Sequence, residues 1–178
     1  MAVIQIQDKS FETFIPEQDV IASIDKVAEK INSDLNGVRP LFVCVLNGAF
    51  MFASDLIRRI TLECEISFLK VASYEGTQST GKVKQLIGLN EDIKGRTVVL
   101  IEDIVDTGET MAMLLEQLRG LGAADDRIAT LLYKPDSCRN DLKPDYVGLS
   151  IPPDFIVGYG FDYNGYGRNL PDIYTLVK

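Results

Sequence analysis

The sequence predicts an α/β protein built on a mostly parallel, twisted sheet flanked by helices, and three observations support this. Short apolar runs at 40–46 and 97–101 alternate with segments whose apolar residues recur at helical spacing. A run that is apolar throughout is typical of a strand buried on both faces, as in parallel sheets. The 178 residues fit one domain. Strands that alternate with helices imply parallel neighbours joined by right-handed crossovers.

The first half of the chain divides into five expected elements. Pro16 suits a first helical turn, and the apolar spacing after it predicts an amphipathic helix over 16–32. After an Asn36-Gly37 turn, residues 40–46 predict a buried strand and residues 49–60 a second helix. The remaining segments predict a strand at 64–74, a small polar loop at 75–82 and a returning strand at 83–88.

The second half repeats the alternation of strand and helix. Residues 97–101 (TVVLI) are the strongest signal for a buried strand in the chain. Residues 110–121 predict a helix whose inward face comprises Met111, Leu114, Leu115, Leu118 and Leu121. Gly122 suits the C-terminal cap of that helix. Further strands are expected at 128–133, 146–151 and, briefly, 156–157.

Composition and charge exclude several classes of function. Lys and Arg number 18 and Asp and Glu 26, so the formal net charge is −8, which repels a nucleic-acid backbone and predicts no nucleic-acid partner. The chain has no histidine. That excludes Ser-His-Asp triads, Cys-His dyads and H-E-x-x-H zinc sites. A general base must therefore be a carboxylate, a lysine, a tyrosine or a thiolate.

Cysteine usage and targeting signals point to the cytoplasm. The three cysteines, Cys44, Cys64 and Cys138, match no metal or disulfide spacing. Cys44 lies in an apolar run and is expected to be a small buried hydrophobe. No signal peptide and no membrane-length apolar stretch is visible, so we expect a cytoplasmic protein with no membrane partner.

The most informative stretch is residues 98–110, VVLIEDIVDTGET. A buried strand is expected to end in two adjacent acids, Glu102 and Asp103, at the edge where open α/β sheets bind ligands. Gly108 opens the next helix, whose backbone N–H groups and dipole favour an anion. Thr107 and Thr110 add hydroxyl groups. These features predict a cradle for one phosphate group.

Acids beside a phosphate cradle make sense if they hold sugar hydroxyls or Mg²⁺, which prefers oxygen ligands and substrate phosphates. The residues themselves therefore predict a site for a phosphorylated sugar with Mg²⁺. A purely structural interpretation is also open. In it, Asp106 caps the helix, and Glu102 and Asp103 are solvated residues at the end of a strand.

The same stretch resembles the phosphoribosyl-diphosphate (PRPP) motif of type I phosphoribosyltransferases. That motif has four apolar residues, two acids, two apolar residues and Asp-Thr-Gly-x-Thr. The chain is similar to the 6-oxopurine branch, the hypoxanthine-guanine phosphoribosyltransferases, over about residues 40–170. The supporting segments occur in family order: 46–50, 73–74 with 78–81, 134–135, 155–159, 162–164 and Arg168.

This resemblance implies a pentosyltransferase of purine salvage. Hypoxanthine or guanine would attack C1 of PRPP, with Mg²⁺ as cofactor, to give IMP or GMP and pyrophosphate. The type I phosphoribosyltransferase fold would form one domain over 1–178, with a core of about 36–150 and a small hood of about 1–15 and 151–178. A mobile lid loop at 73–84 would include Ser73 and Tyr74. A homodimer or homotetramer is also implied.

The resemblance assigns residues to the PRPP half of the site. Asp106 would be the catalytic base near N7 of the purine, and Glu102 and Asp103 would hold the ribose hydroxyls. The 5′-phosphate loop would comprise Thr107, Gly108, Glu109 and Thr110. The pyrophosphate would contact Leu46, Asn47, Gly48 and Arg168, often with a cis peptide at Leu46-Asn47.

The resemblance also assigns the purine half and the metal ligands. Lys134 would donate to O6 of the base, which selects 6-oxopurines over adenine. Phe155 would stack on the base, and Ile156 would present backbone atoms to its edge. Asp162 would lie in the purine site and ligate a second Mg²⁺. The implied metal ligands are thus Glu102, Asp103 and Asp162.

Departures from the family pattern leave alternatives open. The family often has lysine where this chain has Asn47, and Gly165 and Gly167 replace larger residues. A xanthine-preferring purine phosphoribosyltransferase fits the same motifs, and so does a regulator that senses PRPP or nucleotides. A uracil- or orotate-type enzyme has less support, because Ser73-Tyr74 and Phe155 resemble the purine branch.

Overall fold

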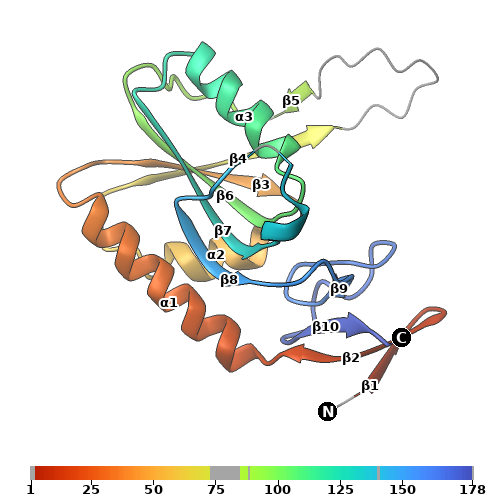
Figure 1. Ribbon diagram of the computed structural model, residues 1–178. Coiled ribbons are helices and arrows are strands. Elements are labelled where there is room, and N and C mark those ends of the chain that lie inside the picture. The colour runs from red at the N-terminus through yellow and green to blue at the C-terminus, as the bar shows by residue number, and fades with distance from the viewer. Residues whose placement is uncertain (1–2, 73–84, 88, 140, 178) are drawn as a thin grey trace, which may run out of the picture.

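A six-stranded sheet forms the centre of the molecule, and the computed structural model describes residues 3–72, 85–87, 89–139 and 141–177 (Figure 1). The strand order is β5-β4-β3-β6-β7-β8, and all neighbours are parallel except β4 and β5. The strands are β3 (Leu41–Leu46), β4 (Glu65–Ala72), β5 (Gln85–Ile87), β6 (Thr97–Val105), β7 (Asp125–Tyr133) and β8 (Tyr146–Ser150). The expected α/β class is therefore confirmed.

Helices cover both faces of this sheet. The helices are α1 (Glu17–Asp34), α2 (Phe50–Ile57) and α3 (Glu109–Gly120). α1 and α2 lie on one face and α3 on the other (Figure 1). Alternate residues of each central strand supply the two layers: Phe42 and Ile101 pack in the α1–α2 layer, whereas Val43 and Leu100 pack in the α3 layer. The unbroken apolar runs thus mark strands buried on both faces.

A second, antiparallel sheet forms the hood, in the order β1-β2-β10-β9. Its strands are β1 (Val3–Ile6), β2 (Lys9–Ile15), β9 (Ile156–Val157) and β10 (Ile173–Leu176). The first and last strands of the chain therefore lie in one layer (Figure 1). Phe11, Val157 and Tyr174 form its small core. The exact boundary between core and hood stays a prediction.

Several element boundaries differ from those expected. β6 runs on to Val105, so Glu102 and Asp103 lie inside the strand instead of beyond its end. α2 ends at Ile57, not at residue 60. Leu121 is 56% exposed, because α3 ends at Gly120 and Leu121 is the C-terminal cap that follows. Gly122 follows that cap with a left-handed φ of +89°, as a C-terminal glycine should.

The expected loop at 75–82, the first residues of the returning strand, and the lid residues Ser73 and Tyr74 lie outside the described residues. In the described part of the chain, no helix has the length and apolar character that crossing a membrane requires.

Candidate active site

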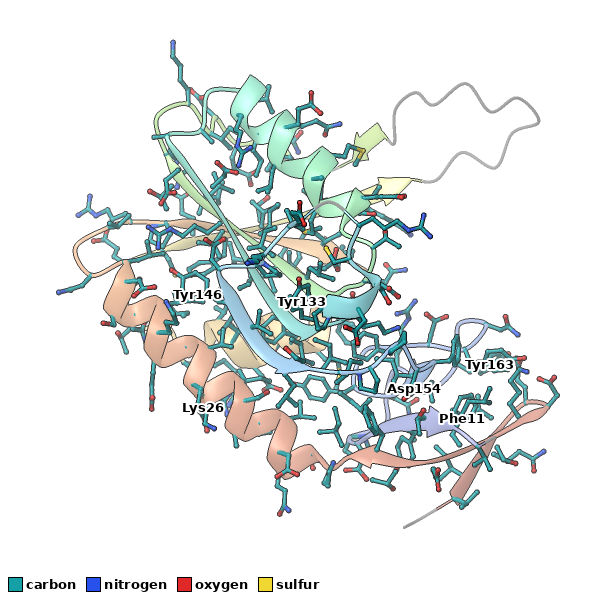
Figure 2. All side chains as sticks on the ribbon, in the orientation of Figure 1. Phe11, Lys26, Tyr133, Tyr146, Asp154 and Tyr163 are labelled. Atoms are coloured by element: carbon teal, nitrogen blue, oxygen red, sulfur yellow. The ribbon has the colours of Figure 1, made fainter. Side chains whose placement is uncertain are left out.

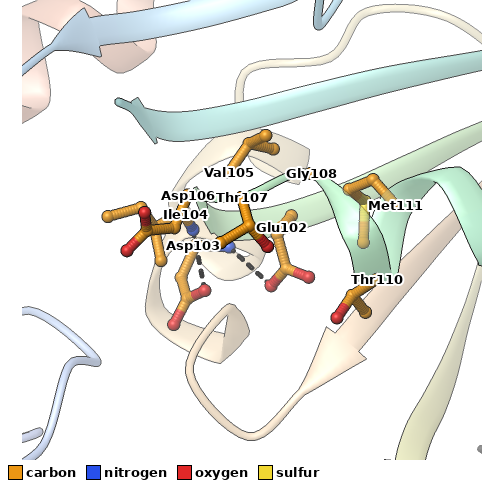
Figure 3. Close-up of a pocket in the computed structure, with 9 residues that line it drawn as sticks. All are labelled: Glu102, Asp103, Ile104, Val105, Asp106, Thr107, Gly108, Thr110 and Met111. Carbon is orange, nitrogen blue, oxygen red and sulfur yellow. Dashed lines mark hydrogen bonds between the residues drawn. The ribbon is translucent and has the colours of Figure 1, made fainter. Parts of the chain in front are cut away.

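The carboxyl ends of three neighbouring parallel strands, β3, β6 and β7, bring the sequence-predicted site residues to one edge of the sheet. A pocket of about 140 Å³ opens there, lined by nine residues of the 102–111 segment (Figure 3). The loop after β3 supplies Leu46–Gly48, and the residue after β7 is Lys134. The hood approaches this edge with residues 155–168.

Of the paired acids near the end of β6, Glu102 is buried and Asp103 is half-buried. Only 8% of Glu102 is exposed, and its carboxylate accepts a hydrogen bond from the Asp103 N–H at 3.0 Å (Figure 3). Asp103 accepts the Ile104 N–H at 2.7 Å. Burial and the adjacent Asp103 charge raise the pKa of Glu102, and burial also raises that of Asp103. The alternative in which both acids are solvated strand-end residues is therefore wrong.

The turn after β6 forms a narrow backbone loop. Gly108 has a left-handed φ of +82° and is itself the N-cap of α3, so Asp106 does not cap the helix. A Cβ at Gly108 would lie 3.0 Å from the Cys138 sulfur, so a side chain there would be both strained and crowded. The Thr107 carbonyl accepts the Arg139 N–H at 3.1 Å. The 138–139 segment thus buttresses the loop.

Asp106 and Lys134 form an ion pair of 3.1 Å between Oδ2 and Nζ. The Lys134 side chain is 10% exposed, whereas that of Asp106 is 48% exposed. The register of β6 on β7 explains this contact. Val105 of β6 lies opposite Tyr133 of β7, and Asp106 and Lys134 are the residues that directly follow these two. The Lys134 N–H also donates to the Val105 carbonyl at 3.0 Å. Sequence reasoning gave the two residues separate roles and missed this pair.

The loop after β3 is packed from two sides. The Leu46-Asn47 peptide is cis. A Cβ on Gly48 would lie 1.7 Å from Asp103 Oδ2, and a Cβ on Gly160 would lie 2.3 Å from the Gly48 carbonyl oxygen. The Gly48 backbone therefore lies between a strand-end acid and the hood, and both glycines are required for that approach.

Phe155 presents a half-exposed ring at the hood's edge. Its exposed fraction is 48%, and Tyr163 meets it edge-on, with 6.0 Å between ring centroids. The Phe11 ring of β2 lies 6.3 Å from the Phe155 ring and 6.0 Å from the Tyr163 ring, measured between centroids. Figure 2 shows Phe11 and Tyr163 together in the hood. The Tyr163 hydroxyl donates to Asp8 at 2.9 Å. The first forty residues carried no recognisable motif, so sequence reasoning missed the support that Phe11 and Asp8 give to this ring.

The other predicted site residues of the hood, Arg168, Asp162 and Ile156, have partners within the hood. Arg168 pairs with Asp162 at 2.8 Å and donates from Nη1 to the Gly160 carbonyl at 2.6 Å. Asp162 also accepts the Gly165 N–H at 2.7 Å. Ile156 is buried in β9 and pairs with Thr175.

Among the residues that the structure describes, no cluster of three or more His, Cys, Asp or Glu side chains is placed to hold a metal ion. Glu102 and Asp103 are neighbours, whereas Asp162 pairs with Arg168. A cation at Glu102 and Asp103 would therefore need oxygen ligands from a bound substrate as well.

Comparisons with known proteins agree with this geometry. Residues 13–164 match the model of the phosphoribosyl transferase domain. Hypoxanthine-guanine phosphoribosyltransferase of Streptococcus thermophilus is 40% identical over 163 residues, which cover 91% of each chain. The enzyme of the same name from Bacillus subtilis is 38% identical, covering 93% of this chain and 92% of the other.

Solved structures give the same result. A hypoxanthine phosphoribosyltransferase from Staphylococcus aureus superposes with a TM-score of 0.84 at 38% identity and covers 93% of this chain and 91% of its own. A mutant hypoxanthine phosphoribosyltransferase from Trypanosoma cruzi, solved in a ternary complex with its substrates, superposes with a TM-score of 0.83 at 32% identity. The match covers 93% of this chain and 94% of the other.

Proposed function

Because the chain belongs to the phosphoribosyl transferase family, in its hypoxanthine-guanine branch, we propose that this edge of the sheet transfers the phosphoribosyl group of PRPP. The acceptor is hypoxanthine or guanine, and the products are IMP or GMP and pyrophosphate. The observation that carries the proposal is the pair of the buried Glu102 and the half-buried Asp103, with the left-handed Gly108 turn five residues after Asp103. That arrangement offers acids to a ribose and backbone N–H groups to its phosphate.

The PRPP half of the proposed site extends from β6 to the loop after β3. Thr107, Gly108, Glu109 and Thr110 would bind the 5′-phosphate through N–H groups at the α3 N-terminus and hydroxyls. The Leu46–Gly48 loop would contact the pyrophosphate through its backbone, so Asn47 in place of the family's common lysine leaves that contact intact. Arg168 would bind pyrophosphate oxygens with its planar guanidinium.

The purine half of the proposed site lies between Lys134 and Phe155. The Asp106–Lys134 pair keeps a buried ammonium beside a carboxylate, and a 6-oxopurine offers acceptors and donors to both. Lys134 would donate to O6, and Asp106 would hold the proton at N7 as general base. Phe155 would stack on the ring, Ile156 would meet its edge with backbone atoms, and Asp162 would lie nearby.

Mg²⁺ is the proposed cofactor. Glu102 and Asp103 are hard oxygen donors on adjacent residues, which fits an ion that takes one or two carboxylates and completes its shell with substrate oxygens and water. Asp162 would contribute at a second position. When bound, the ion would neutralise charge on the leaving pyrophosphate. Glu102 and Asp103 themselves orient the ribose hydroxyls.

A lid over the site, an oligomeric assembly and a cytoplasmic location complete the proposal. Ser73 and Tyr74 in the 73–84 loop would cover the site and exclude water during transfer. Phe50, Ile66 and Phe68 are exposed apolar side chains of α2 and β4, and they support a homodimer or homotetramer. A cytoplasmic location stays a prediction from the sequence.

Initial rates with PRPP, Mg²⁺ and a panel of hypoxanthine, guanine, xanthine and adenine test the proposal. We expect IMP or GMP formation and negligible use of adenine, because the amino group of adenine cannot accept a hydrogen bond from the Lys134 ammonium. Xanthine as the best substrate would redirect the assignment to a xanthine-preferring enzyme, and adenine as the best substrate would contradict the role of Lys134. No turnover of any base would refute the transferase activity.

The general-base assignment has its own test. Asp106→Asn keeps the size of the side chain but removes its ability to take a proton, so we expect kcat to fall by about 100-fold or more. Asp34→Asn is the matched control, because it makes the same change at the last residue of α1, where the carboxylate pairs with Lys30 of the same helix. Near-normal turnover by Asp106→Asn would contradict the role of Asp106.

A further inference from the structure

The hood loop between β9 and β10 touches the Leu46–Gly48 loop at Gly160. A Cβ there would lie 2.3 Å from the Gly48 carbonyl oxygen, so the two backbones are in direct contact. Gly160 also holds Arg168, because its N–H donates to the Arg168 carbonyl at 2.9 Å and its carbonyl accepts Arg168 Nη1 at 2.6 Å. One position of the hood thus sets the separation between Arg168 and Gly48.

Tyr159, the residue before Gly160, has an unusual backbone. Gly158, Tyr159 and Gly160 all have left-handed φ angles, of +99°, +47° and +96°. Glycine adopts such angles freely, whereas an aromatic residue does so only where its surroundings impose them. The Tyr159 N–H donates to the Leu170 carbonyl at 2.8 Å. This bond alone does not require a tyrosine, so the side chain must have a separate role.

The Tyr159 side chain reaches across to α2. It is 2% exposed within the main core, and its hydroxyl donates a hydrogen bond to the Asp55 carboxylate. Burial and the Asp55 charge raise the pKa of the phenol, so it stays a donor. Arg59, four residues further on, donates to the Asp55 backbone carbonyl at 2.8 Å. α2 begins at Phe50, two residues after Gly48.

We propose that Tyr159 and Asp55 form a positioning pair that sets the distance between Arg168 of the hood and the Leu46–Gly48 loop. The inference rests on the proposed function, in which both of these segments contact the pyrophosphate. Neither Tyr159 nor Asp55 is among the proposed substrate contacts. The proposed purine contacts of Lys134 and Phe155 do not depend on it, since Lys134 follows β7 and Phe155 is supported by Phe11 and Tyr163.

Tyr159→Phe removes only the hydroxyl and tests the pair. We expect the KM for PRPP, and the KM for pyrophosphate in the reverse reaction, to rise about tenfold, because a buried hydrogen bond to a charged group is lost. The KM for hypoxanthine should stay within about twofold, since its contacts are unchanged. Tyr174→Phe is the matched control, because this buried hood hydroxyl bonds Asp172 at 3.3 Å and makes no link to α2.

Asp55→Asn provides a second route if Tyr159→Phe is recovered unfolded, and it should raise the same two constants. The double variant should be no worse than the more impaired single variant, because both remove one interaction. Unchanged constants for PRPP and pyrophosphate would overturn the proposal, as would equal rises in all three constants or the same rises in Tyr174→Phe. Wild-type protein is assayed first, and its failure to use PRPP would instead refute the proposed function.

Discussion

Adding one methyl group to Gly48 should damage the PRPP half of the site. In Gly48→Ala the new Cβ would lie 1.7 Å from Asp103 Oδ2 and 2.7 Å from its Cγ. Real Cβ atoms essentially never approach another heavy atom within 3.0 Å, so the pair must separate by at least 3.0 − 1.7 = 1.3 Å. Either the carboxylate rotates away or the loop moves.

The cost follows from what holds the Asp103 carboxylate. It accepts the Ile104 N–H at 2.7 Å, and rotation breaks that bond. Losing a hydrogen bond to a charged group costs about 1.5–3 kcal/mol, and an off-rotamer side chain adds about 0.5–1.5 kcal/mol. The sum, about 2–4.5 kcal/mol, corresponds to a loss of about 30-fold to about 2,000-fold in kcat/KM for PRPP.

The assay is IMP formation at varied PRPP and saturating hypoxanthine. Gly120→Ala is the control, because a Cβ at Gly120, the last residue of α3, meets no atom within 4 Å. It should leave kcat/KM within about twofold and slightly stabilise the helix. A Gly48→Ala enzyme within about threefold of wild type would refute the reasoning, because the expected cost exceeds about 2 kcal/mol.

Three further outcomes are expected. Burial and the Asp103 charge raise the pKa of Glu102, so folding takes up a proton and the free energy of unfolding falls as pH rises from about 4.5 through that raised value. Denaturant titrations across pH should show this slope, and Glu102→Gln should flatten it; an unchanged slope would contradict the assignment. Burial raises the pKa of Cys44 to about 12, so a thiol reagent at about pH 8 should label Cys138 but not Cys44 in native protein, as peptide mass spectrometry can measure. Comparable labelling of both would show that Cys44 is accessible. Gly108→Ala forces a side chain into left-handed backbone at a cost of about 1–2 kcal/mol, so the KM for PRPP should rise about 5- to 30-fold. Gly37→Ala, with φ +81° and no atom within 4 Å of its Cβ, carries the same strain in the turn after α1 and should not raise that KM.

Periodicity predicted the central sheet well because its signals are local. The apolar runs of β3 and β6 report burial on both faces, and the spacing in α1 and α3 reports one buried stripe. The prediction was wrong where charged residues continue a strand. Glu102 and Asp103 look like the end of a strand, yet β6 continues through them. A buried acid such as Glu102 cannot be distinguished from a solvated acid in a sequence.

Contacts between distant segments could not be predicted from the sequence. Asp106 and Lys134 are 28 positions apart and meet only through the register of β6 on β7. Phe11 reaches Phe155 because β2 pairs with β10, and no local pattern records that pairing. The motif predicted the geometry of the turn after β6, because that turn involves only a few neighbouring positions. The contacts that support the Phe155 ring involve distant segments and have no such local signal.

The pairing of β2 with β10 joins two segments of the chain that are far apart in sequence. Ile15 lies opposite Ile173, and α1 follows β2 directly. Ile173 and Tyr159 of the hood also pack in the same core cluster as the buried faces of α1 and α2. Loss of β10 would therefore disturb that core as well as the hood, so the hood and the central sheet should unfold together in one cooperative transition.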